Sequence, residues 1–246
     1  MELQRLYSYV RQAIDRYGMI EGGDKIAIGL SGGKDSVALL AALSGLQKFY
    51  PKAFQIVAIT VDLGLGNMEF SKMEQYCQQL GVEYHIVKTQ IYDIVFQERK
   101  EKHPCSLCAK LRKGALNTKA MELGCNKIAY AHHRDDFVDT FFLSLMQEGR
   151  IHSLSPMYTL DKTGLTLIRP LFLVPEAKII GFQKKYQLPF IKNMCPADGA
   201  TKRKEMKEQI HILEREQRNL RNKVFTAIQH AGFEDWPKDT NERKGR

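Results

Sequence analysis

The 246-residue sequence contains no apolar run that approaches the roughly 20 residues of a membrane-spanning helix. Its first segment, MELQRLYSYVRQAIDRYG, carries charges of both signs and no continuous apolar stretch, so we expect no secretory signal peptide. Internal repeats and low-complexity linkers are also missing. These absences disfavour membrane and repeat proteins, and we expect a cytoplasmic protein without a membrane partner.

Cysteine is scarce as well, with five residues in the chain. The number is odd, and a reducing cytosol disfavours disulfides. Cys77 and Cys125 lie in apolar-patterned segments, EQYCQQL and ELGCNKI, and we expect both to be small buried side chains. The three remaining cysteines are candidates for metal or redox chemistry.

Cys105 and Cys108 form a C-x-x-C in the sequence PCSLC, a spacing at which two thiolates can bind one metal. Cys195, in NMCPAD, is the third candidate ligand, and His103 is a possible fourth. Three cysteines leave one coordination position open in a zinc site, or one iron free in an iron–sulfur cubane. The spacing alone leaves both metals possible, and a coincidental pair remains the plain alternative.

Acidic residues are fewer than basic ones, since 28 Asp and Glu stand against 37 Lys and Arg, a formal net charge of +9 at pH 7. An enzyme for small anionic metabolites rarely needs such an excess. In nucleic-acid binding, by contrast, neutralisation of phosphates supplies most of the affinity. The charge therefore favours a nucleic-acid partner, with a basic surface that has no partner as the alternative.

Apolar runs alternate with helical patterns along most of the chain. Near-continuous apolar strands separated by helices predict an α/β fold with a parallel five-stranded sheet and helices on both faces. In such sheets ligands bind beyond the carboxyl ends of the strands, where the strand order reverses. The expected strands are Lys25–Leu30, Phe54–Val61, Glu83–Lys88, Lys127–Ala131 and, more weakly, Leu165–Arg169. The expected helices are Ser36–Phe49, Met68–Leu80, Asp93–Lys102, a stretch after Cys108, and Asp135–Met146.

Two further segments flank this core. Residues 1–22 predict an N-terminal helix, Met1–Tyr17, packed on a domain that spans residues 23–200. Residues 201–246 predict one long amphipathic basic helix, beginning near Ala200, followed by a disordered polar tail. The helix could pack with one solvated face, or present a basic ridge to RNA or to a second copy of the chain.

The segment SGGKDS, residues 31–36, follows the first strand and opens the first helix of the expected sheet. Gly32 and Gly33 allow a tight turn that directs backbone N–H groups at an anion, and the helix N-terminus adds its partial positive charge. Ser31 and Ser36 can donate hydrogen bonds, and Lys34 supplies a full charge. The segment matches neither G-x-x-x-x-G-K-[ST] nor G-x-G-x-x-G, which excludes a P-loop NTPase and a dinucleotide fingerprint.

Polar residues also follow two other expected strands. Thr60, Val61 and Asp62 end the second strand and precede the glycine-rich LGLGN. The motif AHHRDD begins a helix after the fourth strand, and its carboxylates could bind Mg²⁺ or orient a substrate base. Its histidines could shuttle a proton or contact phosphate. The plain alternatives are an exposed loop aspartate and an N-cap formed by Asp135.

SGGKDS resembles the pyrophosphate loop of the N-type ATP pyrophosphatases. Together with CSLCAKLRKG, HHRDDFVDTFF and one late cysteine, it resembles the tRNA 2-thiocytidine synthetases from Leu3 to about Lys202. The resemblance implies the adenine nucleotide alpha hydrolase-like fold of the PP-loop ATPases. It also implies an ATP-dependent tRNA sulfurtransferase that adenylates the C2 oxygen of cytidine 32 in the anticodon loop. Sulfur then replaces this oxygen, and AMP and pyrophosphate are released.

The same resemblance implies roles for individual residues, together with ATP, Mg²⁺ and a [4Fe-4S] cluster. The implied partners are the tRNA anticodon stem-loop, a sulfur donor such as a cysteine desulfurase, and a second copy of the chain in a homodimer. The implied cluster ligands are Cys105, Cys108 and Cys195, and the fourth iron would take the sulfur. The implied catalytic residues are Lys34, Arg112, Asp135 and Asp136. The implied nucleotide-binding residues are Leu30, Ser31, Gly32, Gly33, Lys34, Asp35, Ser36, Thr60, Val61, Asp62 and His132.

The chain departs from the pattern of these synthetases at two places. Ala131 replaces a glycine before the two histidines, and Asp139-Thr140 replaces a Glu-Thr pair. A related thiouridine-forming branch carries a lysine where this chain has Arg112, and it has extra cysteine pairs that this chain lacks. Both differences favour cytidine over uridine as the acceptor.

Three alternative hypotheses for the function remain compatible with the sequence. The same chemistry could act on tRNA uridine. Lysidine formation is disfavoured because it needs no cluster. A nucleotide- and RNA-binding module with structural zinc would have no ATP turnover and no sulfide.

Overall fold

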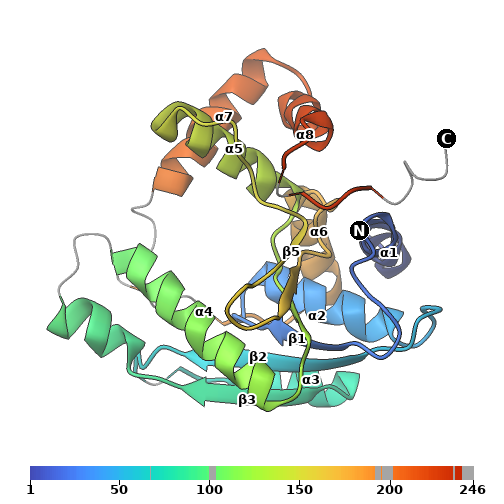
Figure 1. Cartoon of the computed structure of the whole chain (residues 1–246), viewed down its shortest axis with the longest axis vertical. Coiled ribbons are helices and arrows are strands. Elements are labelled where there is room, and N and C mark those ends of the chain that lie inside the picture. The colour runs from blue at the N-terminus through green and yellow to red at the C-terminus, as the bar shows by residue number, and fades with distance from the viewer. Residues whose placement is uncertain (67, 100–103, 192–194, 196–201, 235, 240–246) are drawn as a thin grey trace.

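The computed structural model describes the chain except for residues 67, 100–103, 192–194, 196–201, 235 and 240–246. The described part forms a six-stranded sheet in the order β3-β2-β1-β4-β6-β5 (Figure 1). Five neighbouring strands are parallel, as the sequence predicts, and β5 pairs antiparallel with β6. The strands are β1 (Lys25–Gly29), β2 (Gln55–Asp62), β3 (Glu83–Lys88), β4 (Lys127–Ala129), β5 (Met157–Thr159) and β6 (Thr166–Ile168).

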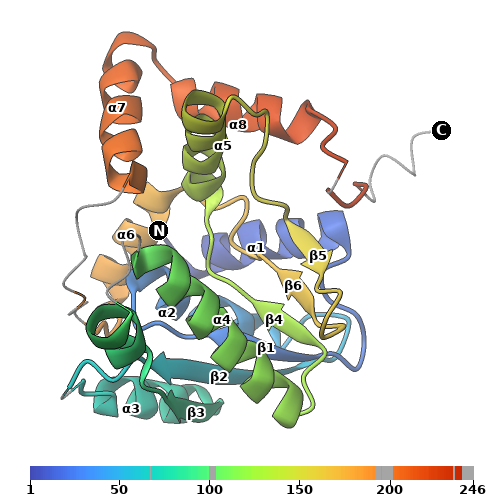
Figure 2. The ribbon, with the colours of Figure 1, turned by 60° about the vertical axis from the view of Figure 1, so that its left-hand side comes forward.

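Helices cover both faces of the sheet, which confirms the predicted architecture (Figure 2). On one face α1, α2, α3 and α6 pack into a large core, and on the other α4 covers a smaller one. The helices are α1 (Leu3–Tyr17), α2 (Lys34–Leu46), α3 (Ser71–Leu80), α4 (Pro104–Glu122), α5 (Arg134–Glu148), α6 (Glu176–Tyr186), α7 (Lys202–Glu216) and α8 (Leu220–His230). A short π-helix, η1, spans Asp93–Glu98.

The two cores explain why the sequences of the central strands are unbroken apolar runs. In β1, Ile26 and Ile28 point into the large core, and Ala27, between them, points into the core under α4. Successive side chains of a strand alternate between faces, so a strand buried on both sides needs apolar residues at every position. None of the described helices has the length and apolarity that a bilayer crossing requires.

The structure corrects several expected elements. The edge strand β5 and helix α6 were not predicted. β5 has only three residues, none of them buried, and so lacks the buried run of a central strand. The helix expected over Asp93–Lys102 is the π-helix η1 up to Glu98, and residues 100–103 lie outside the described part. Helix α4 begins at Pro104, before the C-x-x-C and not after it.

The C-terminal segment is not one long helix. Helix α7 ends at Glu216 and α8 begins at Leu220, because Asn219 adopts the left-handed conformation with φ of 64°. Both helices contact α5, and the three lie together beyond the sheet (Figures 1 and 2). We call α7 and α8 the C-terminal hairpin. The predicted division into residues 1–22, 23–200 and 201–246 stays a prediction.

A buried ion pair stabilises the sheet at the amino ends of β1 and β4. Lys127 of β4 places its Nζ 2.7 Å from Asp24 Oδ2 and donates to the carbonyl of Met19 at 3.0 Å. Asn126 Nδ2 also donates to Asp24 Oδ1 at 2.7 Å. Both charged residues are nearly buried, at 8% and 4% exposure. The pair ties the turn before β1 to β4.

We expect Lys127→Met to lower the free energy of unfolding by about 3–5 kcal/mol, because it leaves Asp24 buried without its counter-charge. Lys52→Met is the matched control. Lys52 pairs with Glu21 at 2.7 Å, but the two side chains are 43% and 59% exposed, so we expect a loss of less than about 1 kcal/mol. Urea unfolding of both variants measures the difference, and equal effects would contradict it.

Candidate functional site

The SGGKDS loop connects β1 to α2 at the carboxyl end of the sheet. Leu30 anchors its start by donating its N–H to the carbonyl of Ile59 at 2.9 Å. Helix α2 begins at Lys34, and no side chain caps its N-terminus. Ser36 Oγ donates to the Gly33 carbonyl at 2.9 Å and lies 3.2 Å from Ser31 Oγ. The loop thus leaves the N–H groups of the first helical turn available to an anion.

The two glycines of the loop have different roles. Gly32 has φ of 78°, a left-handed conformation, and a Cβ there would lie 2.7 Å from the side chain of Ile191. Ile191 also donates its N–H to the Gly32 carbonyl at 2.9 Å. Gly33 has φ of −76°, and a Cβ there would meet only Ser31 Oγ at 3.5 Å. The tight turn therefore requires glycine at position 32.

The end of β2 lies beside this loop. The Thr60 hydroxyl donates to the Leu30 carbonyl at 2.6 Å and accepts a hydrogen bond from Tyr84 at 2.9 Å. Thr60 thus ties the start of the loop to strand β2. Asp62 Oδ1 accepts the N–H of Gly64 at 3.0 Å. Val61 and Asp62 are half-buried. The structure thus places the predicted nucleoside-binding residues next to the predicted phosphate-binding ones.

Helix α5 begins with the HHRDD motif. His133 is its N-cap residue, and Asp136 Oδ2 accepts the His133 N–H at 3.0 Å. Asp135 does not cap its own helix, contrary to the alternative raised from the sequence. Its Oδ2 accepts the backbone N–H of Glu176, the first residue of α6, at 2.8 Å. Asp135 therefore holds the N-termini of two helices together.

The Glu176 carboxylate is the centre of this region. Lys34 Nζ lies 3.0 Å from its Oε1 and His133 Nε2 lies 3.7 Å from the same oxygen, while Lys207 Nζ donates to Oε2 at 3.4 Å. Sequence reasoning missed Glu176, because an acidic residue in the first turn of a helix is ordinary. The Pro-Glu pair at positions 175 and 176 indicates the start of a helix. It does not indicate that three basic side chains surround the Glu176 carboxylate.

These contacts shift the pKa values of the three groups around the loop. The ion-pair contact with His133, and then that with Lys34, outweighs burial and holds the pKa of Glu176 well below its usual range. Burial works against the charged form of His133, but Glu176, Asp136 and Asp35 outweigh it and raise its pKa. For Lys34, burial is likewise outweighed by Asp35 and Glu176, and its pKa is raised. All three shifts favour the charged forms of these side chains.

The C-terminal hairpin supplies three more cations. Arg203 donates to Asp136 Oδ1 at 3.5 Å and to Thr140 Oγ1 at 3.3 Å. Arg221 donates to Asp139 Oδ1 at 2.9 Å, and Lys207 lies 3.6 Å from Asp139 Oδ2. Asp139 is fully buried, and this burial raises its pKa despite Arg221. The hairpin is thus held to α5 by ion pairs.

The candidate cluster ligands come together from distant parts of the chain. Burial raises the pKa of the Cys108 thiol, the positive charge of Arg112 lowers it, and the neighbouring Cys195 and Cys105 raise it. The three thiols therefore lie close enough to influence one another electrostatically. Cys77 and Cys125 are buried, as predicted.

Within the described part of the chain, no three His, Cys, Asp or Glu side chains form a site tight enough for one metal ion. A single zinc ion needs all its thiolates at about 2.3 Å. A cubane binds each cysteine through a different iron, which allows the thiolates to stand farther apart. Three thiols are a donor set that suits a cubane with one iron left without a protein ligand.

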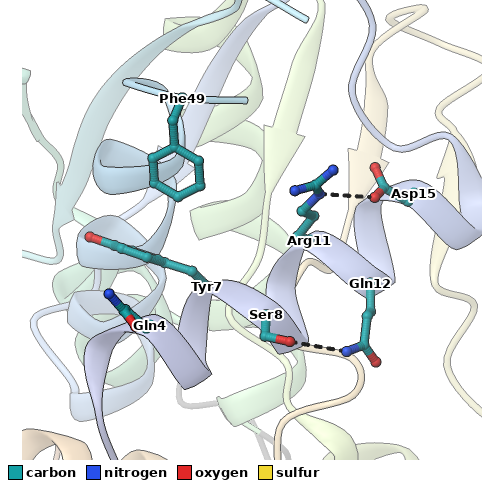
Figure 3. A pocket seen from close by; sticks show the side chains of 7 residues that line it. All are labelled: Gln4, Tyr7, Ser8, Arg11, Gln12, Asp15 and Phe49. Atoms are coloured by element: carbon teal, nitrogen blue, oxygen red, sulfur yellow. Dashed lines mark hydrogen bonds and ion pairs between the residues drawn. The ribbon is translucent and has the colours of Figure 1, made fainter. Parts of the chain in front are cut away.

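A pocket of about 460 Å³ lies elsewhere, against the outer surface of α1 (Figure 3). Tyr7 and Phe49 form its apolar part, and Arg11 and Asp15 lie along its edge. None of its lining residues belongs to the loop, the acidic cluster or the thiol group. The pocket is therefore separate from the candidate site at the carboxyl ends of the strands.

A family model described as a PP-loop domain matches residues 4–228. The chain belongs to the PP-loop domain family. This confirms the family resemblance and the fold expected from SGGKDS and the alternating strands and helices.

Within the PP-loop family, the chain is similar to proteins named tRNA-cytidine(32) 2-sulfurtransferase. The protein from Citrifermentans bemidjiense is 36% identical over 92% of this chain and 90% of its own length. The protein from Bordetella pertussis is 41% identical over 92% of this chain and 71% of its own length. Among solved structures, the U34-tRNA thiolase NcsA from Methanococcus maripaludis, described with its [4Fe-4S] cluster, has a TM-score of 0.76 at 24% identity. This match covers 93% of the present chain and 78% of NcsA, and it supports the fold.

We expect Gly32→Ala to lower the free energy of unfolding by about 1–3 kcal/mol, because the left-handed φ and the contact with Ile191 both penalise a Cβ. Gly33→Ala is the matched control in the same PP-loop, and its effect on stability should stay below about 1 kcal/mol. Thermal unfolding of the two variants provides the test. Equal losses would show that the turn does not require the conformation described for Gly32.

We expect Glu176→Gln to destabilise the protein most between about pH 4.3 and 6.5. The raised pKa of His133 gives stabilisation that is present below about pH 6.5 and lost as pH rises through the folded-state pKa. The lowered pKa of Glu176 gives stabilisation that is present above about pH 4.3 and lost as pH falls. Urea unfolding from pH 4 to 8 measures this window. Glu122→Gln, in an exposed pair with Lys119, should show none.

Proposed function

We propose that this PP-loop protein is an ATP-dependent tRNA sulfurtransferase that converts cytidine 32 of the anticodon loop to 2-thiocytidine. The observation that carries the proposal is the similarity, over 92% of the chain, to proteins named tRNA-cytidine(32) 2-sulfurtransferase. The convergence of the anion-binding loop, the acidic cluster and the group of three thiols supports it. The net charge of +9 suits an RNA substrate.

In the proposed first step, the C2 carbonyl oxygen of the cytosine attacks the α-phosphorus of ATP and pyrophosphate leaves. The open N–H groups at the start of α2 and the Lys34 ammonium stabilise the departing pyrophosphate. Asp136, ionised beside His133 and Arg203, orients the base. Asp135 contributes by holding Glu176 and the start of α6 in place. Activation is required because a carbonyl oxygen is a poor leaving group.

Magnesium would enter this site together with the nucleotide. Asp35 Oδ1 is buried and has no hydrogen-bond partner among the described residues, which suits it to bind a cation. Mg²⁺ commonly binds through one or two carboxylates and substrate phosphates, so a complete protein cage is not needed. Asp35 is therefore the proposed protein ligand.

The three thiols provide the proposed site of the sulfur chemistry. Cys105, Cys108 and Cys195 would hold a [4Fe-4S] cluster that, when bound, presents the sulfur to be transferred. Arg112 lies on the same helix as the first two cysteines, and its charge favours the thiolate of Cys108. Displacement of AMP by sulfur then completes the exchange at C2. The tRNA anticodon stem-loop, a cysteine desulfurase and a second copy of the chain are the proposed partners.

Nucleoside mass spectrometry of bulk tRNA tests the proposed function. We expect 2-thiocytidine to disappear when the gene is deleted, to return with the wild-type gene, and to stay absent with Lys34→Ala. The iron content of the Lys34→Ala protein should match the wild type, because Lys34 pairs with Asp35 and Glu176 and is not a proposed cluster ligand. Loss of a 2-thiouridine species in its place would show that the acceptor is uridine. Unchanged thionucleosides would refute a sulfurtransferase.

Replacing Cys105, Cys108 or Cys195 singly by serine should abolish 2-thiocytidine formation and leave the affinity for a non-hydrolysable ATP analogue unchanged. The reason is that the thiols lie outside the anion-binding loop. Cys77→Ser is the control. It should retain activity and lose about 1–3 kcal/mol of stability, because it buries a hydroxyl in an apolar core. Anaerobic assays of iron and acid-labile sulfide accompany the measurements, and one zinc without sulfide would contradict the cluster.

A further inference from the structure

Arg169 is a buried cation whose role neither the sequence nor the proposed chemistry explains. It follows β6 directly and is 3% exposed. No carboxylate lies within ion-pair distance of it in the described part of the chain, although a buried charge normally requires a counter-charge. Its guanidinium donates to the Ser155 carbonyl and lies 5.5 Å from the centre of the Tyr158 ring. It also hydrogen-bonds the Tyr158 side chain and donates to His132.

The bond between these two residues determines where the histidine proton resides. Arg169 Nε–H donates to Nδ1 of His132 at 3.1 Å. A guanidinium has donors only and is always protonated, so Nδ1 of His132 must be the acceptor. A neutral imidazole with a bare Nδ1 carries its proton on Nε2. His132 is therefore an Nε2–H donor, and no described residue accepts a hydrogen bond from this nitrogen.

The surroundings of His132 keep it neutral. Burial is the main cause that lowers its pKa, to about 3, and the positive charge of Arg169 is the second. Arg203 on α7 and Lys113 on α4 act in the same direction, and Asp136 on α5 opposes them. The Tyr130 ring of the preceding strand lies 5.9 Å away at a steep angle. A proton shuttle at neutral pH, considered from the sequence, does not fit this environment.

We propose that Arg169 is a positioning residue that fixes His132 as a neutral Nε2–H donor to an oxygen of the bound substrate. The proposal deepens the proposed function and depends on it for the identity of that oxygen. The charges that act on His132 come from α4, which carries the C-x-x-C, from α5, which carries the acidic cluster, and from α7. A pyrimidine carbonyl or a phosphate oxygen placed there would accept the bond. A neutral donor orients an attacking oxygen without protonating it, whereas an imidazolium would reduce its nucleophilicity.

The test that does not depend on activity is ¹⁵N NMR of the histidine rings in the substrate-free protein. The His132 signals are assigned by their loss in His132→Gln. We expect the Nε2–H tautomer, with no titration between pH 5.5 and 8.5. In Arg169→Met the ring should stay neutral, because burial, the larger cause of its low pKa, remains. It should lose its single tautomer, because no donor then faces Nδ1. An unchanged tautomer in this variant would contradict the role of Arg169. A wild-type ring that titrates in this range, or that carries its proton on Nδ1, would overturn the proposal whether or not the protein thiolates tRNA.

Activity provides the second readout. In Arg169→Met the ring can carry its proton on Nδ1, which leaves Nε2 without a hydrogen to donate. Turnover should therefore fall, and by the same factor at pH 6 and pH 8, because burial keeps the ring neutral. In a His132→Gln background Arg169→Met should cause no further loss, because the glutamine N–H does not depend on a tautomer. Arg11→Met, on the exposed face of α1, controls for the removal of an arginine.

Turnover should fall in Arg169→Met but not in Arg11→Met, and a further loss on adding Arg169→Met to His132→Gln would refute the proposed role. If Arg169→Met does not fold, His132→Gln and His132→Ala decide the question. Glutamine should then retain at least tenfold more activity than alanine, and equal activities would overturn the proposal. A weakened affinity for the ATP analogue would identify a phosphate oxygen as the acceptor. A change confined to tRNA-dependent turnover would identify the base carbonyl.

Discussion

The ion cluster around Glu176 is the constraint on which the rest of the site depends. One carboxylate at the start of α6 faces Lys34 of the phosphate loop, His133 of α5 and Lys207 of the C-terminal hairpin. Its backbone N–H is held in turn by Asp135. Four segments far apart in the sequence thus meet at one residue. Their geometry is interdependent, because moving any one of them would leave a half-buried charge without its partner.

This cluster also explains why a basic protein carries so many acids at its centre. Lys34 and the cations of the hairpin would repel one another in an empty site, and the carboxylates of α5 and α6 offset that repulsion. A bound triphosphate would compete for the same cations and add negative charge. Asp35 Oδ1, which has no hydrogen-bond partner among the described residues and lies 3.8 Å from His133 Nε2, is the proposed ligand of a divalent cation that would restore the balance. Charge pairing in the free protein thus offsets the repulsion among the cations that the proposed nucleotide would contact.

Local patterns predicted the parts of the fold that local sequence controls. The five parallel strands were found because burial on both faces demands unbroken apolar runs, as in Lys25–Gly29. The anion-binding loop was found because glycine is needed at position 32. The edge strand β5 was not predicted because three partly exposed residues are too few to show the hydrophobic pattern of a strand. The end of α7 before Asn219 was not predicted, because a single left-handed residue does not interrupt the helical spacing of the apolar residues.

The sequence by itself determined the fold class and the family, and it predicted which side chains are reactive, since these depend on spacing and on residue chemistry. Only the tertiary structure decided which side chains meet. It placed Glu176 beside Lys34, brought Cys195 within electrostatic reach of Cys108, and set Arg169 against His132. The physical reason is that ion pairs and hydrogen bonds act over a few ångströms of space. Linear sequence carries no measure of that distance for residues separated by scores of positions.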